Sequence, residues 1–306
     1  MLANNPVGRL PLQSTPLIFG TAPLATQFWG NNEADAVEAA VAGVRAGITW
    51  FDTAPLYGSG EAEERLGLAL RACGDPDVVI ATKVGRPVVH TADGRDSTFD
   101  YSREGTLRSL EDSLKRLGRD HVDVVHVHDP DDHLAEAIDE CLPTLVELRG
   151  QGAIRAVSVG TVRCDTALTL LTEAEPDLMM IAGRLTLLDH AALDELAPEC
   201  VRRGVPLIAA AVFNSGLLAR PQPGAWFDYA PAAADRVRRV QALGELCESY
   251  GVTLRAAALQ YPLRFQPVFA VAVGMASATE VLENIELINQ PITSELWDAL
   301  TQADLF

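Results

Sequence analysis

The chain reads ITWFDTAPLYGSGEAEERLG over residues 48–67. A short apolar run, Ile48–Asp52, ends in a carboxylate and is followed by a loop rich in Pro and Gly. From Glu61 to Ala72, apolar residues recur at the spacing of an amphipathic helix. This part of the chain is therefore predicted to form a strand, a loop and a helix, which together make one unit of an α/β fold.

The same alternation repeats along the whole chain. The other predicted strands are continuous apolar runs, as expected for strands buried on both faces. They are Leu17–Gly20, Val78–Thr82, Val122–Val127, Ile154–Val159, Leu178–Ala182, Pro206–Ala210 and Val268–Val273. Eight strand-helix units over this length predict an α/β (β/α)8 TIM barrel that spans residues 1–306 as a single domain.

Helical patterns separate these strands. They cover residues 32–46, 61–72, 102–116, 134–149, 165–172, 190–203, 235–249 and 277–288. Val7–Leu12 is predicted to form a short N-terminal hairpin that closes the bottom of the barrel, and Ser294–Leu305 an added C-terminal helix. A doubly wound sheet is the alternative fold, but it would require G-x-G-x-x-G after an early strand, and the sequence has none.

Charge and composition exclude several functional classes. The net charge of −18 and pI near 4.6 argue against nucleic acid or an anionic membrane surface as a partner. No apolar run is long enough to predict a membrane span. The five cysteines are scattered and never form C-x-x-C, so reduced thiols are expected rather than disulfides or a cysteine zinc site. Without a secretory signal, the expectation is a cytoplasmic protein, with a monomer as the default.

Four polar residues follow or end consecutive predicted strands, where barrel enzymes carry their functional groups. Asp52 ends the second strand, and Tyr57 lies in the Pro/Gly loop after it. Lys83 ends the third strand and His128 the fourth. A buried lysine needs a carboxylate partner, and Asp52 is the obvious one. Together these residues predict a functional site at the mouth of the barrel.

Three segments resemble the signatures of aldo-keto reductases: FDTAPLYGSGEAEERLG (residues 51–67), TKVG (82–85) and DVVHVHDPD (123–131). The resemblance extends from Phe19 to Asn284. It implies a (β/α)8 barrel, a nicotinamide cofactor and a catalytic set of Asp52, Tyr57, Lys83 and His128. In these roles Lys83 would favour the phenolate of Tyr57, whose ordinary pKa is too high for proton transfer at neutral pH. Asp52 would orient Lys83, and His128 would bind the substrate oxygen.

The resemblance also implies where the cofactor binds. NADPH-using members typically carry a lysine and an arginine where this chain has Gly274 and Glu280. A carboxylate at Glu280 would repel a 2′-phosphate, so NAD is predicted in preference to NADP. The full set of expected cofactor contacts is Gly20, Thr21, Asp52, Gly160, Thr161, Arg184, Phe213, Asn214, Ser215, Gly216, Leu218, Gly274, Glu280, Glu283 and Asn284.

Within this set, the turn at residues 213–218 is expected to meet the pyrophosphate through its backbone N–H groups. Two positions depart from the common pattern. Gly160-Thr161 replaces a Ser-Asn pair that often holds the nicotinamide amide, and Leu185 replaces a tyrosine that often stacks on the ring. Thr161 and Arg184 are predicted to take over these contacts.

A narrower resemblance rests on HDPD (residues 128–131), AGRLTLLD (182–189) and FNSGLLA (213–219). These segments are similar to those of NAD-dependent aldose 1-dehydrogenases, which act on L-fucose, L-galactose or D-arabinose, and of pyridoxal 4-dehydrogenases. The resemblance implies oxidation of a cyclic hemiacetal to a lactone. Trp29, Tyr57, His128 and Asp129 are the predicted substrate contacts.

Three other interpretations remain open at this stage. The chain could be a broad NAD(P)H-dependent carbonyl reductase for aldehydes or ketones, which cofactor preference and reaction direction would distinguish. It could also be a non-catalytic barrel that binds a nicotinamide. The pair His126-x-His128 next to Asp129 could suggest a metal site, but the family resemblance implies none, and the prediction is that no metal is bound.

Overall fold

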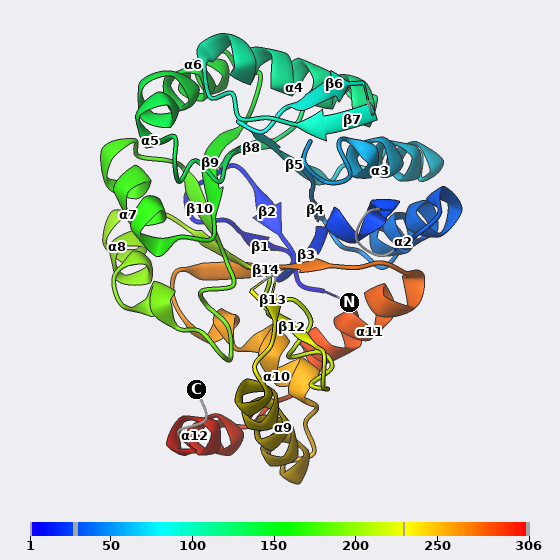
Figure 1. Ribbon diagram of the computed structural model, residues 1–306, viewed down its shortest axis with the longest axis vertical. Helices are drawn as coiled ribbons and strands as arrows, with labels where there is room; N and C mark the ends of the chain where they lie inside the picture. The colour runs from blue at the N-terminus through cyan, green and yellow to red at the C-terminus, as the bar shows by residue number, and fades with distance from the viewer. Residues whose placement is uncertain (1, 27–29, 93, 229, 304–306) are drawn as a thin grey trace.

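The computed structural model describes residues 2–26, 30–92, 94–228 and 230–303. Eight parallel strands close a barrel, in which each strand pairs with the next along the chain and the last pairs with the first (Figure 1). They are β3 (Leu17–Gly20), β4 (Trp50–Asp52), β5 (Val79–Val84), β8 (Val124–His128), β9 (Ala156–Thr161), β10 (Leu178–Ala182), β11 (Leu207–Ala210) and β14 (Val268–Gly274). The predicted (β/α)8 barrel is confirmed.

The barrel interior is a packed core. Alternate residues of the strands point inward and form one apolar cluster, which includes Ile18, Trp50, Val124 and Met180. A second, larger cluster fills the space between the strands and the surrounding helices. The buried Asp52, Lys83 and His128 lie at or near the carboxyl ends of their strands, so this end of the barrel carries the polar chemistry.

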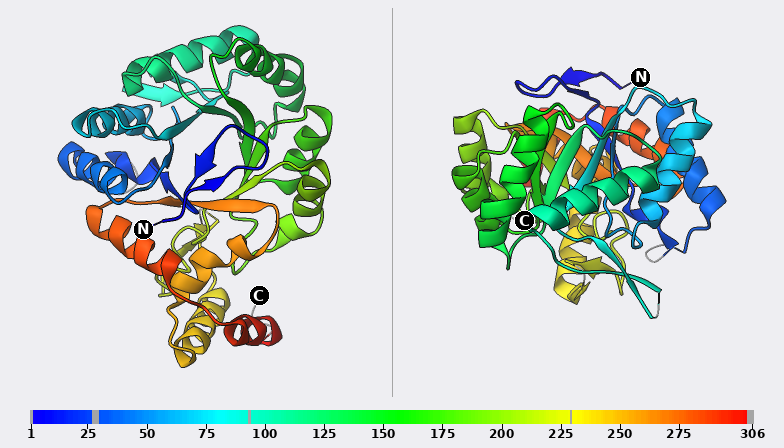
Figure 2. Two further views of the ribbon diagram at one scale, coloured as in Figure 1. Left: turned by 180° about the vertical axis from the view of Figure 1, so that it is seen from behind. Right: turned by 90° about the horizontal axis from the view of Figure 1, so that it is seen from above.

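The opposite end is closed by the N-terminal hairpin. Strands β1 (Asn5–Pro6) and β2 (Gln13–Ser14) pair on either side of residues 7–12, so the predicted Val7–Leu12 segment forms the turn. Val7 and Leu12 are buried among the inward-facing strand residues. Figure 2 shows this hairpin in blue at one end of the barrel, with the long loops after the strands at the other.

Most predicted helices are present within a few residues, and some of them begin at a side-chain cap. Asn32 accepts a hydrogen bond from the amide of Asp35, and Ser102 one from the amide of Gly105, so each begins its helix. These helices are α2 (Glu33–Arg45), α3 (Glu61–Ala72), α4 (Arg103–Leu117), α7 (Cys164–Glu173), α9 (Ala234–Ser249), α11 (Ala278–Asn289) and the added C-terminal helix α12 (Ser294–Gln302).

Two predicted helices are interrupted. The segment 134–149 comprises α5 (Leu134–Glu136), a π-helical stretch (Ala137–Cys141) and α6 (Leu142–Gly150). Pro143 has no N–H to donate to the preceding turn, which weakens a regular ladder there. The segment 190–203 begins with a 3-10 turn (Ala191–Leu193) before α8 (Leu196–Arg203).

Several elements were not predicted. Helix α10 (Leu254–Gln260) follows α9, and 3-10 turns lie at Ala22–Leu24 and Pro262–Arg264. Two hairpins project from the mouth loops: β6 (Val88–Thr91) with β7 (Gly94–Ser97), and β12 (Trp226–Phe227) with β13 (Ala230–Pro231). None of the helices in the described ranges is both long and apolar enough to cross a membrane.

Candidate active site

The centre of the site is a buried ion pair between neighbouring strands. Asp52 ends β4 and Lys83 lies near the end of β5, and both point into the barrel at its mouth. The ammonium of Lys83 lies 2.5 Å from Oδ1 of Asp52 and donates a second hydrogen bond, 2.9 Å long, to the carbonyl of Thr53. The expected Asp52–Lys83 pair is thus present in the structure.

The ionisation of this pair follows from its surroundings. Burial raises the pKa of Asp52, but the charge of Lys83 and the adjacent His126 outweigh it, and the net pKa lies below its ordinary value. Burial likewise lowers the pKa of Lys83, but the charge of Asp52 and the hydroxyl of Tyr57 raise it above normal. Both groups are therefore charged at neutral pH.

Tyr57 reaches this pair from the loop after β4. The ammonium of Lys83 lies 5.1 Å from the centre of the Tyr57 ring and interacts with its hydroxyl. The turn that follows has positive φ angles at Gly58, Ser59 and Gly60, which favours glycine. A Cβ on Gly58 would lie 2.5 Å from that of Ala25. The two glycines thus allow the tight turn between Tyr57 and helix α3.

His128 ends β8 on the other side of Tyr57. The two rings meet edge to face with their centres 6.2 Å apart. Burial, and then the positive charges of Lys83 and Arg86, hold the pKa of His128 well below its ordinary value, so the imidazole is neutral. The hydroxyl of Tyr101 donates to the carbonyl of His128, at 2.6 Å, and so fixes the end of the strand.

Two contributors to this site, Arg86 and Tyr101, were not predicted from the sequence, and a third, His126, was considered only as part of a possible metal site. Arg86 forms an ion pair with Asp129 at 3.1 Å, beside His128 at the mouth. Tyr101 anchors the end of β8. His126 is fully buried and lies 3.3 Å from Oδ2 of Asp52. The only available signal was that His126 shares a strand face with His128.

In the predicted pyrophosphate turn, most backbone amides form hydrogen bonds within the turn or with the residues just before it. The amides of Asn214, Gly216, Leu217 and Leu218 all donate to carbonyls within residues 211–214. The side chain of Leu218 is buried against α9 and α10. These amides are therefore already engaged, so a phosphate near this turn would have to share them.

Arg184, the proposed replacement contact for the nicotinamide, links three mouth loops. Its guanidinium bonds the carbonyl of Val162 at 3.1 Å, Asp189 at 2.9 Å and Asp228 at 2.7 Å. Thr161 donates to Asp131 at 2.8 Å. Leu185 is fully buried in the cluster between strands and helices. Gly160, another predicted cofactor contact, lies on β9 and pairs with His128 of β8.

At the proposed adenosine end, Glu280 caps helix α11. Its carboxylate accepts from the amide of Ala276 at 2.8 Å, while the hydroxyl of the N-cap residue Ser277 accepts from the amide of Glu280, an arrangement close to a capping box but shifted by one residue. Packing favours glycine at position 274, because a Cβ there would lie 2.7 Å from the ring of Pro23. The absence of a lysine at Gly274 is therefore explained by packing.

Glu283 and Asn284 both meet Arg255 of helix α10. The guanidinium of Arg255 lies 2.8 Å from Glu283 and 3.4 Å from the side-chain oxygen of Asn284. Arg255 is thus a cation at this end of the molecule that the sequence reasoning did not include, and its charge is neutralised by Glu283.

Several buried polar atoms at the carboxyl ends of the strands lack a partner within the described part of the chain. They are Oγ1 of Thr21 after β3, Nδ1 of His128 on β8 and Oδ1 of Asn214 after β11. Buried polar groups are normally hydrogen-bonded, so such atoms suit a polar ligand. Gly20, next to Thr21, lies where a Cβ would be 3.0 Å from the carbonyl of Val273. This part of the barrel therefore fits a cofactor with amide and hydroxyl groups.

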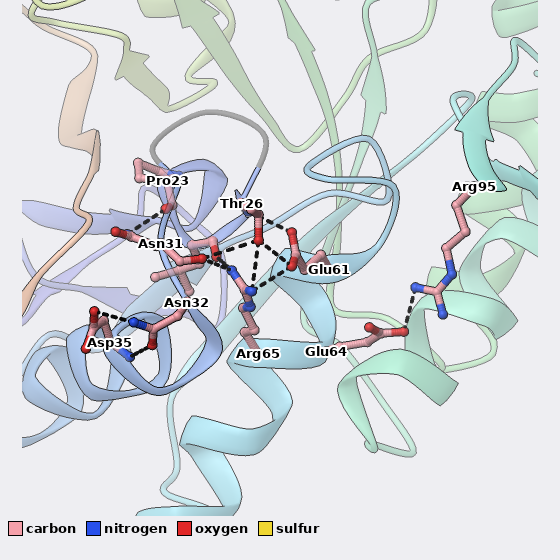
Figure 3. A network of polar contacts seen from close by, with 10 residues as sticks. Pro23, Thr26, Asn31, Asn32, Asp35, Glu61, Glu64, Arg65 and Arg95 are labelled. Carbon is pink, nitrogen blue, oxygen red and sulfur yellow. Dashed lines mark hydrogen bonds and ion pairs between the residues drawn. The ribbon is translucent and has the colours of Figure 1, made fainter. Parts of the chain in front are cut away.

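Trp29, a predicted substrate contact, lies outside the described residues. The chain on either side of it is held by Arg65 of α3, as Figure 3 shows. Arg65 donates to the carbonyls of Leu24 and Asn31, to Thr26 at 3.0 Å and to Glu61 at 2.6 Å. One buried guanidinium thus fixes both ends of the segment that carries Trp29.

The described residues do not include a ligand set of the kind that binds a metal ion. No group of three or more His, Cys, Asp or Glu side chains in those ranges is placed to hold an ion. His126 faces Asp52 and His128 lies beside Asp129, so the two histidines have separate neighbours.

Known proteins resemble this chain over nearly its whole length. Residues 16–305 match the aldo/keto reductase family. Pyridoxal 4-dehydrogenase of Microbacterium luteolum is 36% identical, covering 98% of this chain and 96% of that protein. D-threo-aldose 1-dehydrogenase of a Pseudomonas species is 32% identical (94% and 93% covered), and L-galactose dehydrogenase of Arabidopsis thaliana 31% (93% and 87%).

Solved structures agree on the fold. An aldo-keto reductase from Bacillus halodurans in its holo form has a TM-score of 0.83 at 26% identity, covering 99% of this chain and 96% of that one. Glycerol dehydrogenase from Gluconobacter oxydans has a TM-score of 0.80 at 22% identity, covering 98% and 94%. The chain therefore belongs to the aldo/keto reductase family, whose members are oxidoreductases that use nicotinamide cofactors on small-molecule substrates.

Proposed function

We propose that this enzyme oxidises the cyclic hemiacetal form of an aldose, such as L-fucose, L-galactose or D-arabinose, to a lactone, with Tyr57 as the acid/base and NAD as the preferred cofactor. The observation that carries the chemistry is a tyrosine hydroxyl in contact with a buried, charged Lys83 and flanked by a neutral His128. The names of two relatives, an aldose 1-dehydrogenase and an L-galactose dehydrogenase, support the substrate class.

The proposed mechanism assigns one task to each side chain. Lys83 stabilises the phenolate of Tyr57, which accepts the proton of the anomeric hydroxyl. His128 donates a hydrogen bond to the same oxygen and fixes its position. When bound, the nicotinamide supplies the acceptor for the hydride that leaves the carbon. With proton and hydride removed, the anomeric carbon becomes the lactone carbonyl; in reduction Tyr57 returns the proton to oxygen.

Two residues at the mouth suit a polyhydroxylated substrate. Asp129 offers carboxylate oxygens and Arg86 offers guanidinium donors, side by side at 3.1 Å. Their side chains are about a quarter exposed, at 26% and 23%. Sugar hydroxyls both donate and accept hydrogen bonds, so such a pair can bind two of them. Trp29 remains a proposed wall of the same pocket.

The preference for NAD rests on Glu280. Its carboxylate lies at the first turn of α11 and accepts a hydrogen bond from the amide of Ala276. Without Glu280, this amide would be free to bind a phosphate. A 2′-phosphate placed there would meet negative charge. NADP remains the second choice, and we propose a cytoplasmic monomer of one domain without metal.

Oxidation of pyridoxal is the second candidate. A pyridoxal 4-dehydrogenase at 36% identity favours it, and the proposed chemistry is the same because pyridoxal also forms a cyclic hemiacetal. The choice between the two depends on the mouth, where the pair Arg86–Asp129 suits hydroxyl groups.

The test is formation of NADH or NADPH, followed by absorbance, with L-fucose, L-galactose, D-arabinose and pyridoxal in turn. Reduction of NAD with one of the sugars supports the proposal, and activity with pyridoxal alone supports the second candidate. No activity across the panel, combined with NAD(P)H consumption by simple aldehydes, would instead identify a carbonyl reductase.

A further inference from the structure

His126 lies directly behind the catalytic set. It is fully buried on β8, two residues before His128 and on the same face of the strand. Its Nε2 lies 3.3 Å from Oδ2 of Asp52, whose other oxygen, Oδ1, accepts from Lys83. Neither ring nitrogen of His126, nor Oδ2, has a closer hydrogen-bonding partner in the described part of the chain. A small rotation of the ring would therefore make a direct N–H···O bond.

The charged and titratable groups around His126 favour the neutral ring. Asp52 faces it from β4, Lys83 from β5 and His128 from its own strand, while Ser158 on β9 pairs with it in register. Arg86 and Asp129 lie further out, beside His128. Burial lowers the pKa of His126, and Lys83 lowers it further, against the opposing effect of Asp52.

A neutral donor at this position has a specific effect. A second cation beside Asp52 would compete with Lys83 for the carboxylate, whereas a neutral N–H satisfies Oδ2 without adding charge. It also draws part of the negative charge of the carboxylate away from Lys83. The positive field of Lys83 at the Tyr57 hydroxyl is then less compensated.

We propose that His126 is a positioning residue that donates from Nε2 to Oδ2 of Asp52, fixes the carboxylate toward Lys83, and thereby makes Tyr57 a better base. This inference rests on the proposed role of Tyr57 in the reaction.

Replacing His126 by leucine removes the donor but keeps an apolar side chain of similar size. Asp52 then carries more of its charge toward Lys83, so Tyr57 should lose its proton at higher pH. We expect its midpoint to rise by roughly 0.5–1 pH unit, which lowers kcat/KM for oxidation about 3–10-fold on the acid side of the profile. His126→Gln, which keeps an N–H donor, should restore most of the wild-type midpoint.

The experiment measures this midpoint twice. The ultraviolet absorbance of tyrosinate is titrated in the free enzyme, with Tyr57→Phe subtracted, and kcat/KM for oxidation is measured against pH. Met180→Leu serves as a matched control, because Met180 borders the same interior space as His126 near Gly160 but has an apolar side chain with no N–H to donate. It should leave the midpoint unchanged.

The outcomes separate the two proposals. A raised midpoint in His126→Leu that His126→Gln restores supports the inference. An unchanged midpoint in a folded His126→Leu that still binds NADH overturns it, as does an equal rise in Met180→Leu. Retained activity in Tyr57→Phe would defeat the proposed function instead, while the tyrosinate titration would still report on His126.

A measurement on the unmodified enzyme covers the case in which His126→Leu does not fold. The ring nitrogens of His126 are observed by ¹⁵N NMR and assigned by their loss in His126→Gln. A neutral ring protonated on Nε2 throughout the pH range of the assay supports the inference. An imidazolium, or a neutral ring protonated on Nδ1, overturns it.

Discussion

At the scale of single residues, the site combines one buried cation with two neutral histidines. Lys83 stays charged because Asp52 compensates for its burial, whereas His126 and His128 lose their protons because burial and Lys83 act together. Positive charge is thus concentrated at one atom, the Nζ that meets Tyr57. In the proposed mechanism, the acid/base step therefore depends mainly on this one ammonium group.

Removal of the Tyr57 hydroxyl is the first prediction at this scale. Tyr57→Phe should lower kcat/KM by about 10²–10⁴-fold, the usual contribution of a general acid or base, with little change in NADH affinity. Steady-state kinetics and quenching of tryptophan fluorescence by NADH measure the two effects. More than about a tenth of the wild-type activity in the variant would be incompatible with the proposed role.

The second prediction concerns cofactor choice. Glu280→Arg replaces a carboxylate at the first turn of α11 with a cation, so kcat/KM with NADP relative to NAD should rise at least about tenfold. Losing the hydrogen bond from the amide of Ala276 to Glu280 should also reduce stability by about 1 kcal/mol. Glu286→Arg, the same charge change at an exposed position of α11, is the control. An unchanged ratio in Glu280→Arg would assign Glu280 to capping alone.

The sequence is informative about residues that lie in a distinctive local pattern. Asp52 and Tyr57 are separated by a short Pro/Gly loop, so a motif predicts both, and the structure places them together with Lys83 and His128. Arg86 lies outside these motifs, and the motif that contains His126 does not indicate its contact with Asp52. Their roles depend on which side chains lie across the barrel, at distances that sequence spacing does not encode.

At the scale of elements, helix α3 packs beside β4 and also anchors a mouth loop through one arginine. Its Arg65 is 6% exposed and holds both sides of the segment that carries Trp29 (Figure 3). Its neighbour in the figure, the pair Arg95–Glu64, has side chains 44% and 40% exposed. Replacing each arginine by methionine therefore compares the loss of a buried guanidinium with the loss of an exposed one.

The third prediction follows from this contrast. Arg65→Met removes the ion pair with Glu61, the hydrogen bond to Thr26 and the donor to the carbonyls of Leu24 and Asn31, which should together cost about 2–4 kcal/mol of unfolding free energy. It should also raise KM for substrate. Arg95→Met removes an exposed pair and should stay within about 0.5 kcal/mol of wild type. Urea unfolding and steady-state kinetics measure both; equal losses in the two variants would contradict the anchoring role of Arg65.

Sequence patterns predicted elements well where burial is regular. All eight barrel strands were predicted, but β5 extends to Val84, β8 to His128 and β9 to Thr161. The predicted ends stopped short because polar residues interrupt the apolar runs there, although these residues still point into the mouth. The hairpins β6–β7 and β12–β13 are largely exposed, so no alternation of buried residues marked them.

At the scale of the whole molecule, pH should act on stability through the buried histidines. Burial lowers the pKa values of His126, His128 and His190 below their ordinary value of 6.5. Below that value the unfolded chain binds protons that the folded protein does not, so the free energy of unfolding falls as the pH falls. Above it, the three groups are neutral in both states and have no effect.

The fourth prediction is therefore a loss of thermal stability between about pH 7 and about pH 5, of up to about 1.4 kcal/mol per buried histidine for each pH unit below the ordinary value. Calorimetry over this range measures it. His128→Gln should make the dependence shallower, and His121→Gln, whose side chain is 59% exposed, should not. A slope that is equal in both variants and the wild type would exclude this cause.

The N-terminal hairpin, which fills one end of the barrel with Val7 and Leu12, has a consequence for engineering. Because that end is sealed by residues remote from Tyr57, we expect the largely exposed parts of the mouth loops, residues 88–98 and 219–231, to tolerate changes that leave the barrel core packed. Libraries that change substrate choice should therefore vary these loops and leave the hairpin intact. Conversely, thermostabilising changes to the hairpin could be combined with such a library, because Val7 and Leu12 pack at the end of the barrel opposite Tyr57.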